Sequence, residues 1–291
     1  MKTMSKKHLN TRQITQVAPT LLSKMVADAL TEDMGEGDVN ALLINENEKA
    51  QAQVVTREAM TVCGRAWVDE VFRQIDSEVK LIWRCDDGEK LLPNALVFEA
   101  IGLARSILSA ERGALNFLQM LSGVATMTRS YVDAVAGTSA EILDTRKSIP
   151  GFRLAQKYAV KCGGGVNHRI GLFDAFLIKE NHIASCGHSI TEAVKRARLI
   201  APQKLIEVEV ENFDELDAAM KAEVDVIMLD NFSLNAMQKA VKTVAGKIPL
   251  EASGNVSIET VRTIAETGVD FISVGALTKH IKAIDLSMRF V

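Results

Sequence analysis

Positive charge gathers in one segment of an otherwise slightly acidic chain. The sequence has 291 residues and a formal net charge of −3, yet residues 143–182 hold seven arginines and lysines against three acids. The cations are Arg146, Lys147, Arg153, Lys157, Lys161, Arg169 and Lys179. Guanidinium forks suit carboxylates, and lysine ammonium groups suit phosphates as point charges. The segment therefore predicts a local site for an anionic ligand, to which the neighbouring His168 adds a further donor.

The seven cations fall into two groups by position. Arg153, Lys157 and Lys161 recur four residues apart, which is typical of the solvated face of a helix, and we interpret them in that way. Arg146, Lys147 and Lys179 differ, because each follows a short apolar run of the kind that forms a buried strand. Their position favours a functional role over a surface role.

Two acids end neighbouring apolar runs further along the chain. Glu209 and Asp230 can hold a metal, bind ribose hydroxyls or stabilise a developing cation. Glu207 and Glu211 alternate with Glu209 and share its strand face. Balancing the nearby cations explains these acids equally well, so the pattern leaves both interpretations open. The five histidines show no ligand spacing, and we expect no tightly bound transition metal.

Small residues mark the last two strand ends. Ser253-Gly254-Asn255 precedes a helix predicted from about Ser257, and Gly275-Ala276-Leu277 follows the final run. Exposed backbone N–H groups at such points bind phosphate, most often after the last two strands of a barrel. The glycines of Cys162-Gly-Gly-Gly165 do not form the G-x-G-x-x-G motif of dinucleotide-binding proteins, because His168 stands where the third glycine would be. They fit an ordinary mobile loop or a loop that lets backbone approach a ligand.

The elements that must position these residues alternate regularly beyond residue 138. Apolar runs at 140–144, 174–179, 204–211, 224–230, 248–253 and 269–275 are separated, for the most part, by helix-like segments, which predicts βαβ units with parallel strands. An open sheet or a barrel satisfies this alternation. Polar residues close six successive runs, and a barrel would bring them to one mouth, so we expect a barrel.

The first half of the chain predicts a small α+β unit. A helix is expected from Thr20, with Thr20 as its cap, and another at 64–74. Strands are expected at 51–58, 79–84 and 96–103, and one or two helices at 110–135, where Gly113 and Gly123 weaken continuity. The N-terminal arm lacks the apolar segment of a secretory signal, so we expect a cytoplasmic protein.

Composition excludes several classes of function. With 47% hydrophobic and 24% charged residues and no long apolar run, the chain is expected to be globular and not to span a membrane. A pI near 6.0 argues against general nucleic-acid binding. The four cysteines form no C-x-x-C pair, which favours free thiols over disulfides or zinc ligands.

Several motifs together resemble one enzyme family. The segments EDMGEGDVN, AERGALNFLQMLSGVAT, DTRKSIPGFR, QKYAVKCGGGVNHRIGLFDAFLIKENH, EVEVEN, MLDN, EASGN and ISVGALT occur in this order. In these segments, which extend over nearly the whole chain, the sequence closely resembles the quinolinate phosphoribosyltransferases. The resemblance implies transfer of a phosphoribosyl group from phosphoribosyl pyrophosphate to quinolinate, giving nicotinate mononucleotide, pyrophosphate and CO2 in NAD biosynthesis, with Mg²⁺ as cofactor.

The same resemblance implies a fold and an assembly. The expected fold is a small N-terminal α/β sandwich domain joined to an incomplete (β/α) barrel. We predict an arm at 1–19, the sandwich at 20–120 with residues 281–291 returning to it, and the barrel at 121–280. A homodimer is expected, in which the sandwich domain of one subunit covers the barrel mouth of the other.

The resemblance also assigns residues to the two substrates. The quinolinate pocket would use Arg112 from the partner subunit with Thr145, Arg146, His168, Arg169 and Lys179. The catalytic residues Lys147, Glu209 and Asp230 would surround phosphoribosyl pyrophosphate with Ser253, Gly254, Asn255, Gly275, Ala276 and Leu277. Mg²⁺ would be held mainly through this substrate, with Glu209 and Asp230 as its candidate protein ligands.

Two departures and three alternatives accompany this assignment. Gly113 and Asn40 stand where the family usually has threonine, and Gly113 is the one that bears on the placement of Arg112. A nicotinate or nicotinamide salvage transferase needs fewer carboxylate-binding cations. A phosphoribosyltransferase of the other structural type would show an adjacent acidic pair, whereas VDVIMLDNF has one acid at the strand end. A non-catalytic barrel that senses a metabolite is the third alternative, against which the presence of Lys147, Glu209 and Asp230 counts.

Overall fold

The chain folds into two compact units, each built from separate stretches of sequence. In this computed structural model, which describes residues 13–291, the small unit comprises 14–129, 154–164 and 280–291, and the large unit comprises 13, 130–153 and 165–279. The boundary predicted at residues 120–121 falls inside one long helix, α3 (Ala104–Ala134). Residues 1–12 of the predicted arm lie outside the described residues.

A four-stranded antiparallel sheet forms the frame of the small unit. Its strands are β1 (Lys49–Thr56), β3 (Lys80–Trp83), β5 (Leu96–Leu103) and β12 (Leu286–Phe290), in the order β12-β1-β5-β3. The C-terminal strand pairs with β1, Ala52 facing Phe290. A second, two-stranded sheet joins β2 (Met60–Thr61) to β4 (Lys90–Leu91). Residues 286–290 thus complete the sheet of the N-terminal half.

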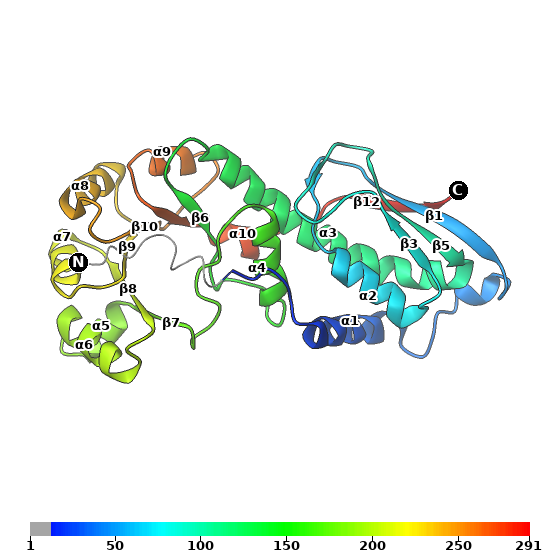
Figure 1. Ribbon diagram of the computed structural model, residues 1–291, viewed down its shortest axis with the longest axis horizontal. Helices are drawn as coiled ribbons and strands as arrows, with labels where there is room; N and C mark the ends of the chain where they lie inside the picture. Colours follow the sequence, from blue (N-terminus) through cyan, green and yellow to red (C-terminus); the bar gives the residue numbers. More distant parts are fainter. Residues whose placement is uncertain (1–12) are drawn as a thin grey trace. The chain divides into compact units, whose positions relative to one another are not determined.

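Helices α1 (Pro19–Met34), α2 (Arg65–Ile75) and α3 belong to this unit, with a short 3-10 helix η2 (Ala41–Leu43), and α2 and α3 run along the sheet in Figure 1. Ala18, and not the predicted Thr20, caps α1, because Pro19 supplies the fixed φ of a first helical residue. The stretch predicted as one or two helices is a single helix. It passes unbroken through Gly123, where a Cβ would lie 2.2 Å from the Lys282 carbonyl oxygen.

Arg153, Lys157 and Lys161 lie on helix α4 (Arg153–Cys162). The prediction that they form a solvated face is wrong for two of them. Lys157 is fully buried, with 0% of its surface exposed, and Arg153 is half-buried. Arg153 donates to Ser148 Oγ at 2.9 Å and to the Ile170 carbonyl at 3.3 Å. Only Lys161 is exposed as predicted. Spacing along a helix identifies a shared face but not what covers it.

Six parallel strands form the core of the large unit. They are β6 (Glu141–Leu143), β7 (Ala175–Ile178), β8 (Leu205–Val210), β9 (Val226–Asp230), β10 (Leu250–Ser253) and β11 (Phe271–Ser273), in the order β6-β11-β10-β9-β8-β7. Leu143 also bridges to Val166. The two end strands, β6 and β7, are not paired with each other within residues 13–291. The expected fold class, a small α/β domain together with an incomplete α/β barrel domain, is confirmed.

The crossover helices lie outside these strands in Figure 1. They are α5 (Glu180–Ser185), α6 (Ile190–Ile200), α7 (Phe213–Lys221), α8 (Leu234–Val244) and α9 (Val261–Ala265), and the short helix α10 (Ala276–Lys279) follows β11. Ser189, Asn212 and Ser233 cap α6, α7 and α8 by accepting a backbone N–H three residues on. The helix predicted from about Ser257 begins instead at Val261, so turn backbone separates it from Asn255.

Two further expectations bear on function. All four cysteines lie within the described residues, and none of them forms a disulfide there. No helix within the described range combines the length and the apolar character needed to cross a bilayer.

Candidate active site

The strand register places the chemically active residues on one face of the sheet. Ser253 lies opposite Asp230, and Glu209 and Glu251 lie opposite Met228 from either side. Because side chains alternate along a strand, Glu209, Asp230 and Ser253 face the same way near the carboxyl ends. Glu207 and Glu251 lie two residues earlier on the same faces of β8 and β10. Asp230 and Ser253 lie at the carboxyl ends of their strands, where the sequence predicted a mouth, and Glu207 and Glu251 belong to a buried floor.

Two guanidinium groups approach each other at this mouth. Burial lowers the pKa of Arg169, and repulsion from Arg146 lowers it further. The Nε atom of Arg146 is buried and has no hydrogen-bond partner among the described residues. Arg169 donates to the Ala175 carbonyl at 3.4 Å. Like charges and an unused buried donor cost free energy, which an anion with several oxygens would recover.

Lys179, the residue that follows β7, forms an ion pair with Glu209. Burial raises the pKa of the Glu209 carboxyl against the lowering effect of Lys179, and the nearby charge of Asp230 raises it further. The two predicted acids are therefore close enough to interact. Lys179, which the sequence assigned to quinolinate, therefore contacts Glu209, which it assigned to phosphoribosyl pyrophosphate.

Lys147 packs against the loop that follows β11. A Cβ at Gly275 would lie 3.1 Å from Lys147 Cδ and 3.9 Å from its Nζ, so the missing side chain makes room for the lysine. Thr278 Oγ donates to the Lys147 carbonyl at 2.7 Å, and the Lys147 N–H donates to Thr145 Oγ at 3.1 Å. The ammonium group is thus held beside the Gly275–Leu277 backbone, as a phosphate site requires.

The loop after β10 is held by a residue that the sequence prediction missed. Asn231 accepts a hydrogen bond from Asn255 Nδ2 at 3.4 Å, and its own Nδ2 donates to Asp230 Oδ2 at 2.8 Å. Its backbone N–H donates to the Ser253 carbonyl at 2.9 Å. Asn231 belongs to the MLDN motif, in which the sequence analysis identifies only the acid Asp230 as a candidate.

Gly254 has a positive φ of 101°, and a Cβ there would lie 2.1 Å from Asn231 Oδ1. We expect Gly254→Ala to destabilise the protein by about 1–3 kcal/mol and to weaken binding of phosphoribosyl pyrophosphate, because both the backbone strain and the clash distort the loop. Gly246→Ala is the matched control, since Gly246 has a φ of 72° but open space around it. Equal KM values for the two variants would contradict this role of the loop.

The buried floor consists of His168, Glu207 and Glu251. His168 Nε2 lies 2.9 Å from Glu207 Oε2 and 3.4 Å from Glu251 Oε2. Burial lowers the pKa of His168, but the two carboxylates outweigh burial and raise it. The Arg169 N–H lies 2.8 Å from His168 Nδ1, and Nε2 on the other side of the ring faces the two carboxylates.

Asp144 anchors the segment that carries His168. It is fully buried and accepts the His168 N–H at 2.8 Å and Asn167 Nδ2 at 2.7 Å. The floor and this anchor explain why the chain folds back here after the glycine-rich turn. Glu207 was noted in the sequence only for sharing the face of Glu209, and no pattern marked Glu251.

The Glu251 carboxyl in this floor makes the free energy of unfolding depend on pH. Burial and the charge of Glu207 raise the pKa of Glu251 to about 7 from its ordinary value of 4.5. The folded protein therefore binds more protons than the unfolded chain between these values, and this contribution to stability is lost as pH rises from about 4.5 through 7. We expect Glu251→Gln to flatten that part of the profile, measured by thermal unfolding without ligands. Parallel profiles for variant and parent would contradict this.

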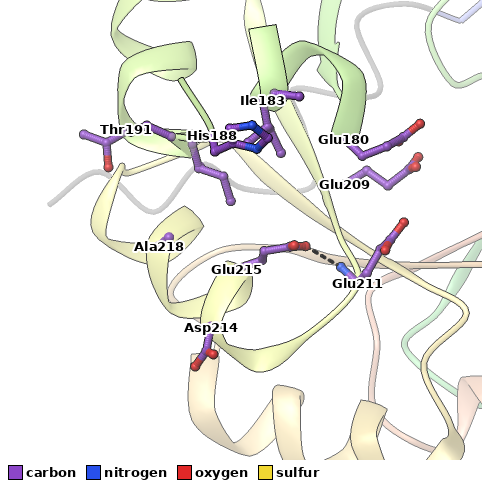
Figure 2. A pocket seen from close by; sticks show the side chains of 12 residues that line it. Glu180, Ile183, His188, Thr191, Glu209, Glu211, Asp214, Glu215 and Ala218 are labelled. Carbon is purple, nitrogen blue, oxygen red and sulfur yellow. Dashed lines mark hydrogen bonds between the residues drawn. The ribbon is translucent and has the colours of Figure 1, made fainter. Parts of the chain in front are cut away.

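A cavity of about 470 Å³ adjoins the mouth but does not suit the same ligand. Figure 2 shows Glu180, Glu209 and Glu211 on one side of it and Asp214 and Glu215 on another. Its lining contains no lysine or arginine, so it would repel a dicarboxylate. Glu209 is the one predicted site residue in its lining.

The remaining predicted ligand, Arg112, belongs to the small unit, where its side chain is exposed on α3. A Cβ at the adjacent Gly113 would make ordinary contacts, 3.5 Å from Leu30 and 3.7 Å from Val71. Lack of space for a Cβ therefore does not explain why glycine occurs at position 113 instead of the family's usual threonine.

Comparison with known proteins identifies the family. Residues 31–122 match the quinolinate phosphoribosyl transferase N-terminal domain, and residues 124–289 match its C-terminal domain. The chain belongs to the quinolinate phosphoribosyltransferase family. It is 41% identical to a probable carboxylating nicotinate-nucleotide pyrophosphorylase of Bacillus subtilis over 92% of each chain. The family predicted from the sequence is thus confirmed.

Solved structures of the family agree. The nicotinate-nucleotide pyrophosphorylase of Francisella tularensis is 50% identical, with a TM-score of 0.94 over 96% of this chain and 99% of that one. The Ehrlichia chaffeensis protein of the same name is 41% identical, with a TM-score of 0.88 over 92% and 98%. A human nicotinic acid phosphoribosyltransferase, 11% identical with a TM-score of 0.62 over 94% and 74%, shares only the fold. The fold alone therefore does not separate the two transferase activities.

Proposed function

We propose that this member of the family transfers the phosphoribosyl group of phosphoribosyl pyrophosphate to quinolinate and releases pyrophosphate and CO2. The observation that carries this proposal is the pair of guanidinium groups, Arg146 and Arg169, at the mouth that also holds Lys147 and the Gly275 loop. Quinolinate brings two carboxylates, and the second substrate brings phosphates. Both kinds of anion have suitable partners here.

The residues divide the reaction between them. Arg146 and Arg169 bind the dicarboxylate, with Lys179 and Thr145 completing the pocket, and His168 supports Arg169 from the buried floor. The quinolinate nitrogen attacks C1 of the ribose while the C1–O bond to pyrophosphate breaks, through a cationic sugar. Lys147 stabilises the negative charge that develops on the departing pyrophosphate. Glu209 and Asp230 position the ribose and stabilise its positive charge.

Decarboxylation then needs no further protein cofactor. Once ribosylated, the ring nitrogen is cationic and accepts the electron pair of the C–C bond as the adjacent carboxylate leaves as CO2. A proton replaces the carboxylate on that carbon. The site has only to bind the ring in place while this occurs, which the paired arginines do.

Glu209 and Asp230 fit a Mg²⁺ ion bound through the substrate. Both are oxygen donors on neighbouring strand ends, close enough for Asp230 to affect the pKa of Glu209. Mg²⁺ typically takes one or two carboxylates together with phosphate oxygens. When bound, it would neutralise pyrophosphate charge. The Lys179 ammonium occupies one oxygen of Glu209, and Asn231 Nδ2 donates to one oxygen of Asp230, so each carboxylate keeps a second oxygen for the ion.

We further propose a cytoplasmic homodimer in which Arg112 of one subunit completes the quinolinate pocket of the other. Its exposure on α3 leaves it available for such a contact, and its guanidinium would add a third fork for carboxylates. An isologous dimer would form two equivalent sites.

A product assay tests the proposed reaction. Purified protein with Mg²⁺ and phosphoribosyl pyrophosphate is given quinolinate or nicotinate, and mononucleotide, pyrophosphate and CO2 are measured. We expect all three from quinolinate and little product from nicotinate. Product mainly from nicotinate would indicate a salvage transferase. Binding of quinolinate without any product would indicate a metabolite sensor.

A further inference from the structure

Two thiols and a carboxylate meet in the small unit, outside the proposed active site. The Sγ atoms of Cys63 and Cys162 and a carboxylate oxygen of Asp87 all lie within 4.8 Å of one another. Cys63 precedes α2, Asp87 lies in the turn between β3 and β4, and Cys162 ends α4. Because three segments far apart in the sequence converge here, the spacing of the cysteines could not indicate the cluster.

Asp87 is oriented as metal-ligating carboxylates usually are. Tyr158 donates its hydroxyl to Asp87 Oδ2 at 2.8 Å, while the N–H groups of Gly64 and Arg65 donate to Oδ1 at 3.0 and 3.3 Å. The Tyr158 ring lies against Trp67, with centroids 5.7 Å apart. Outer hydrogen bonds of this kind fix the ligand before the metal arrives. Carboxylate oxygens accept several bonds, so a lone pair remains on Oδ2.

We propose that Cys63, Asp87 and Cys162 form a binding site for a thiophilic divalent cation of the Zn²⁺ type. Two thiolates and a carboxylate are typical zinc ligands, and Asp87 and Cys162 are only half-buried, which gives a cation a path to the fully buried Cys63. Binding releases the two thiol protons, and a water molecule fills the fourth position. The side chain of Tyr158 stays bonded to the carboxylate.

The dimensions of the cluster suit this cation. Zinc bonds of 2.0–2.3 Å place tetrahedral ligand atoms roughly 3.3–3.8 Å apart, so the ligand atoms need to move by only about 1 Å. The two thiols are already within hydrogen-bond reach of each other. Burial raises the pKa of Cys63 in the absence of a cation, so binding should strengthen as pH rises.

A cation bound in this site would hold the C-terminal end of α4 in place. Cys162 leads directly into Gly163, where a Cβ would lie 2.5 Å from Thr128 Cβ and from the Ala125 carbonyl oxygen, so the turn has little freedom. A cation bound at Cys162 would fix the start of the segment that carries His168 and Arg169. The expected consequence is a more stable small unit.

Cobalt titration of the reduced, full-length protein tests the proposal. We expect one Co²⁺ per chain, with the thiolate charge-transfer band and the strong visible bands of tetrahedral Co²⁺, both displaced by Zn²⁺. Zn²⁺ should also raise Tm in proportion to the logarithm of its concentration above Kd. Cys162→Ser and, as a variant that keeps side-chain size, Asp87→Asn should each weaken Co²⁺ binding at least tenfold.

Cys186→Ser is the matched control, because Cys186 is a half-buried free thiol in the other unit. It should leave the spectrum unchanged. Circular dichroism verifies that each variant is folded. The absence of a thiolate band in the folded parent protein, or its loss in Cys186→Ser with retention in Cys162→Ser, would overturn the proposal.

Discussion

Replacement of Lys147 by alanine is expected to lower kcat by roughly 10²–10³-fold while changing quinolinate affinity less than threefold. The reason is position. The Lys147 side chain lies along Gly275, beside the backbone of the Gly275–Leu277 loop, where we propose that negative charge develops as pyrophosphate departs. The guanidinium groups that would bind quinolinate carboxylates belong to Arg146 and Arg169. Steady-state kinetics with a separate quinolinate binding titration would measure both quantities.

The control for this change is Lys221→Ala. Lys221 is an exposed lysine on α7 paired with Asp217, and its removal should leave kcat and affinity as they are. Loss of quinolinate affinity equal to the loss of turnover in Lys147→Ala would show that Lys147 binds the acceptor, and its assigned role would be wrong.

Arg112→Ala and Arg146→Ala are each expected to abolish nearly all activity as homodimers, yet to recover it when mixed. In a heterodimer with shared sites, one site contains both substitutions and the other contains neither. Random reassociation of equal amounts makes half of the dimers mixed, so about a quarter of the parent activity should return. The experiment needs subunits that carry different affinity tags, mixed under conditions that allow exchange.

The complementation has two controls. Arg146→Ala mixed with Arg169→Ala should not recover, because both residues lie in the large unit of one chain and their loss affects the same side of each site. Arg112→Ala mixed with parent protein reports how far subunits exchange. Verified heterodimers of Arg112→Ala and Arg146→Ala without activity would contradict a site shared between subunits.

Much of the barrel could be predicted because its sequence pattern is local. Each strand from β6 to β11 is a short apolar run that ends in a polar residue or is followed directly by one, and Lys179, Asp230 and Ser253 lie at or next to those ends. The register then brings Asp230 and Ser253 side by side. Strand ends are the feature of a parallel barrel that single-sequence patterns describe best.

The floor of the site was beyond such patterns. Glu251 lies inside an apolar run, and only the pairing of β10 with β9 and β11 places it beside His168. Lys157 has the spacing of a surface residue but is fully buried. Neighbours contributed by distant segments decide burial, and no local signal reports them.

The pairing of β12 with β1 also bears on how the chain folds as it is synthesised. These strands lie more than two hundred residues apart, and the small unit takes α4 from the middle of the sequence. Its sheet and its helical contacts therefore remain incomplete until residues 286–290 leave the ribosome. The edge of β1 stays open during this time and can pair with other chains. A ribosome-bound chain that stops before residue 286 should accordingly recruit chaperones.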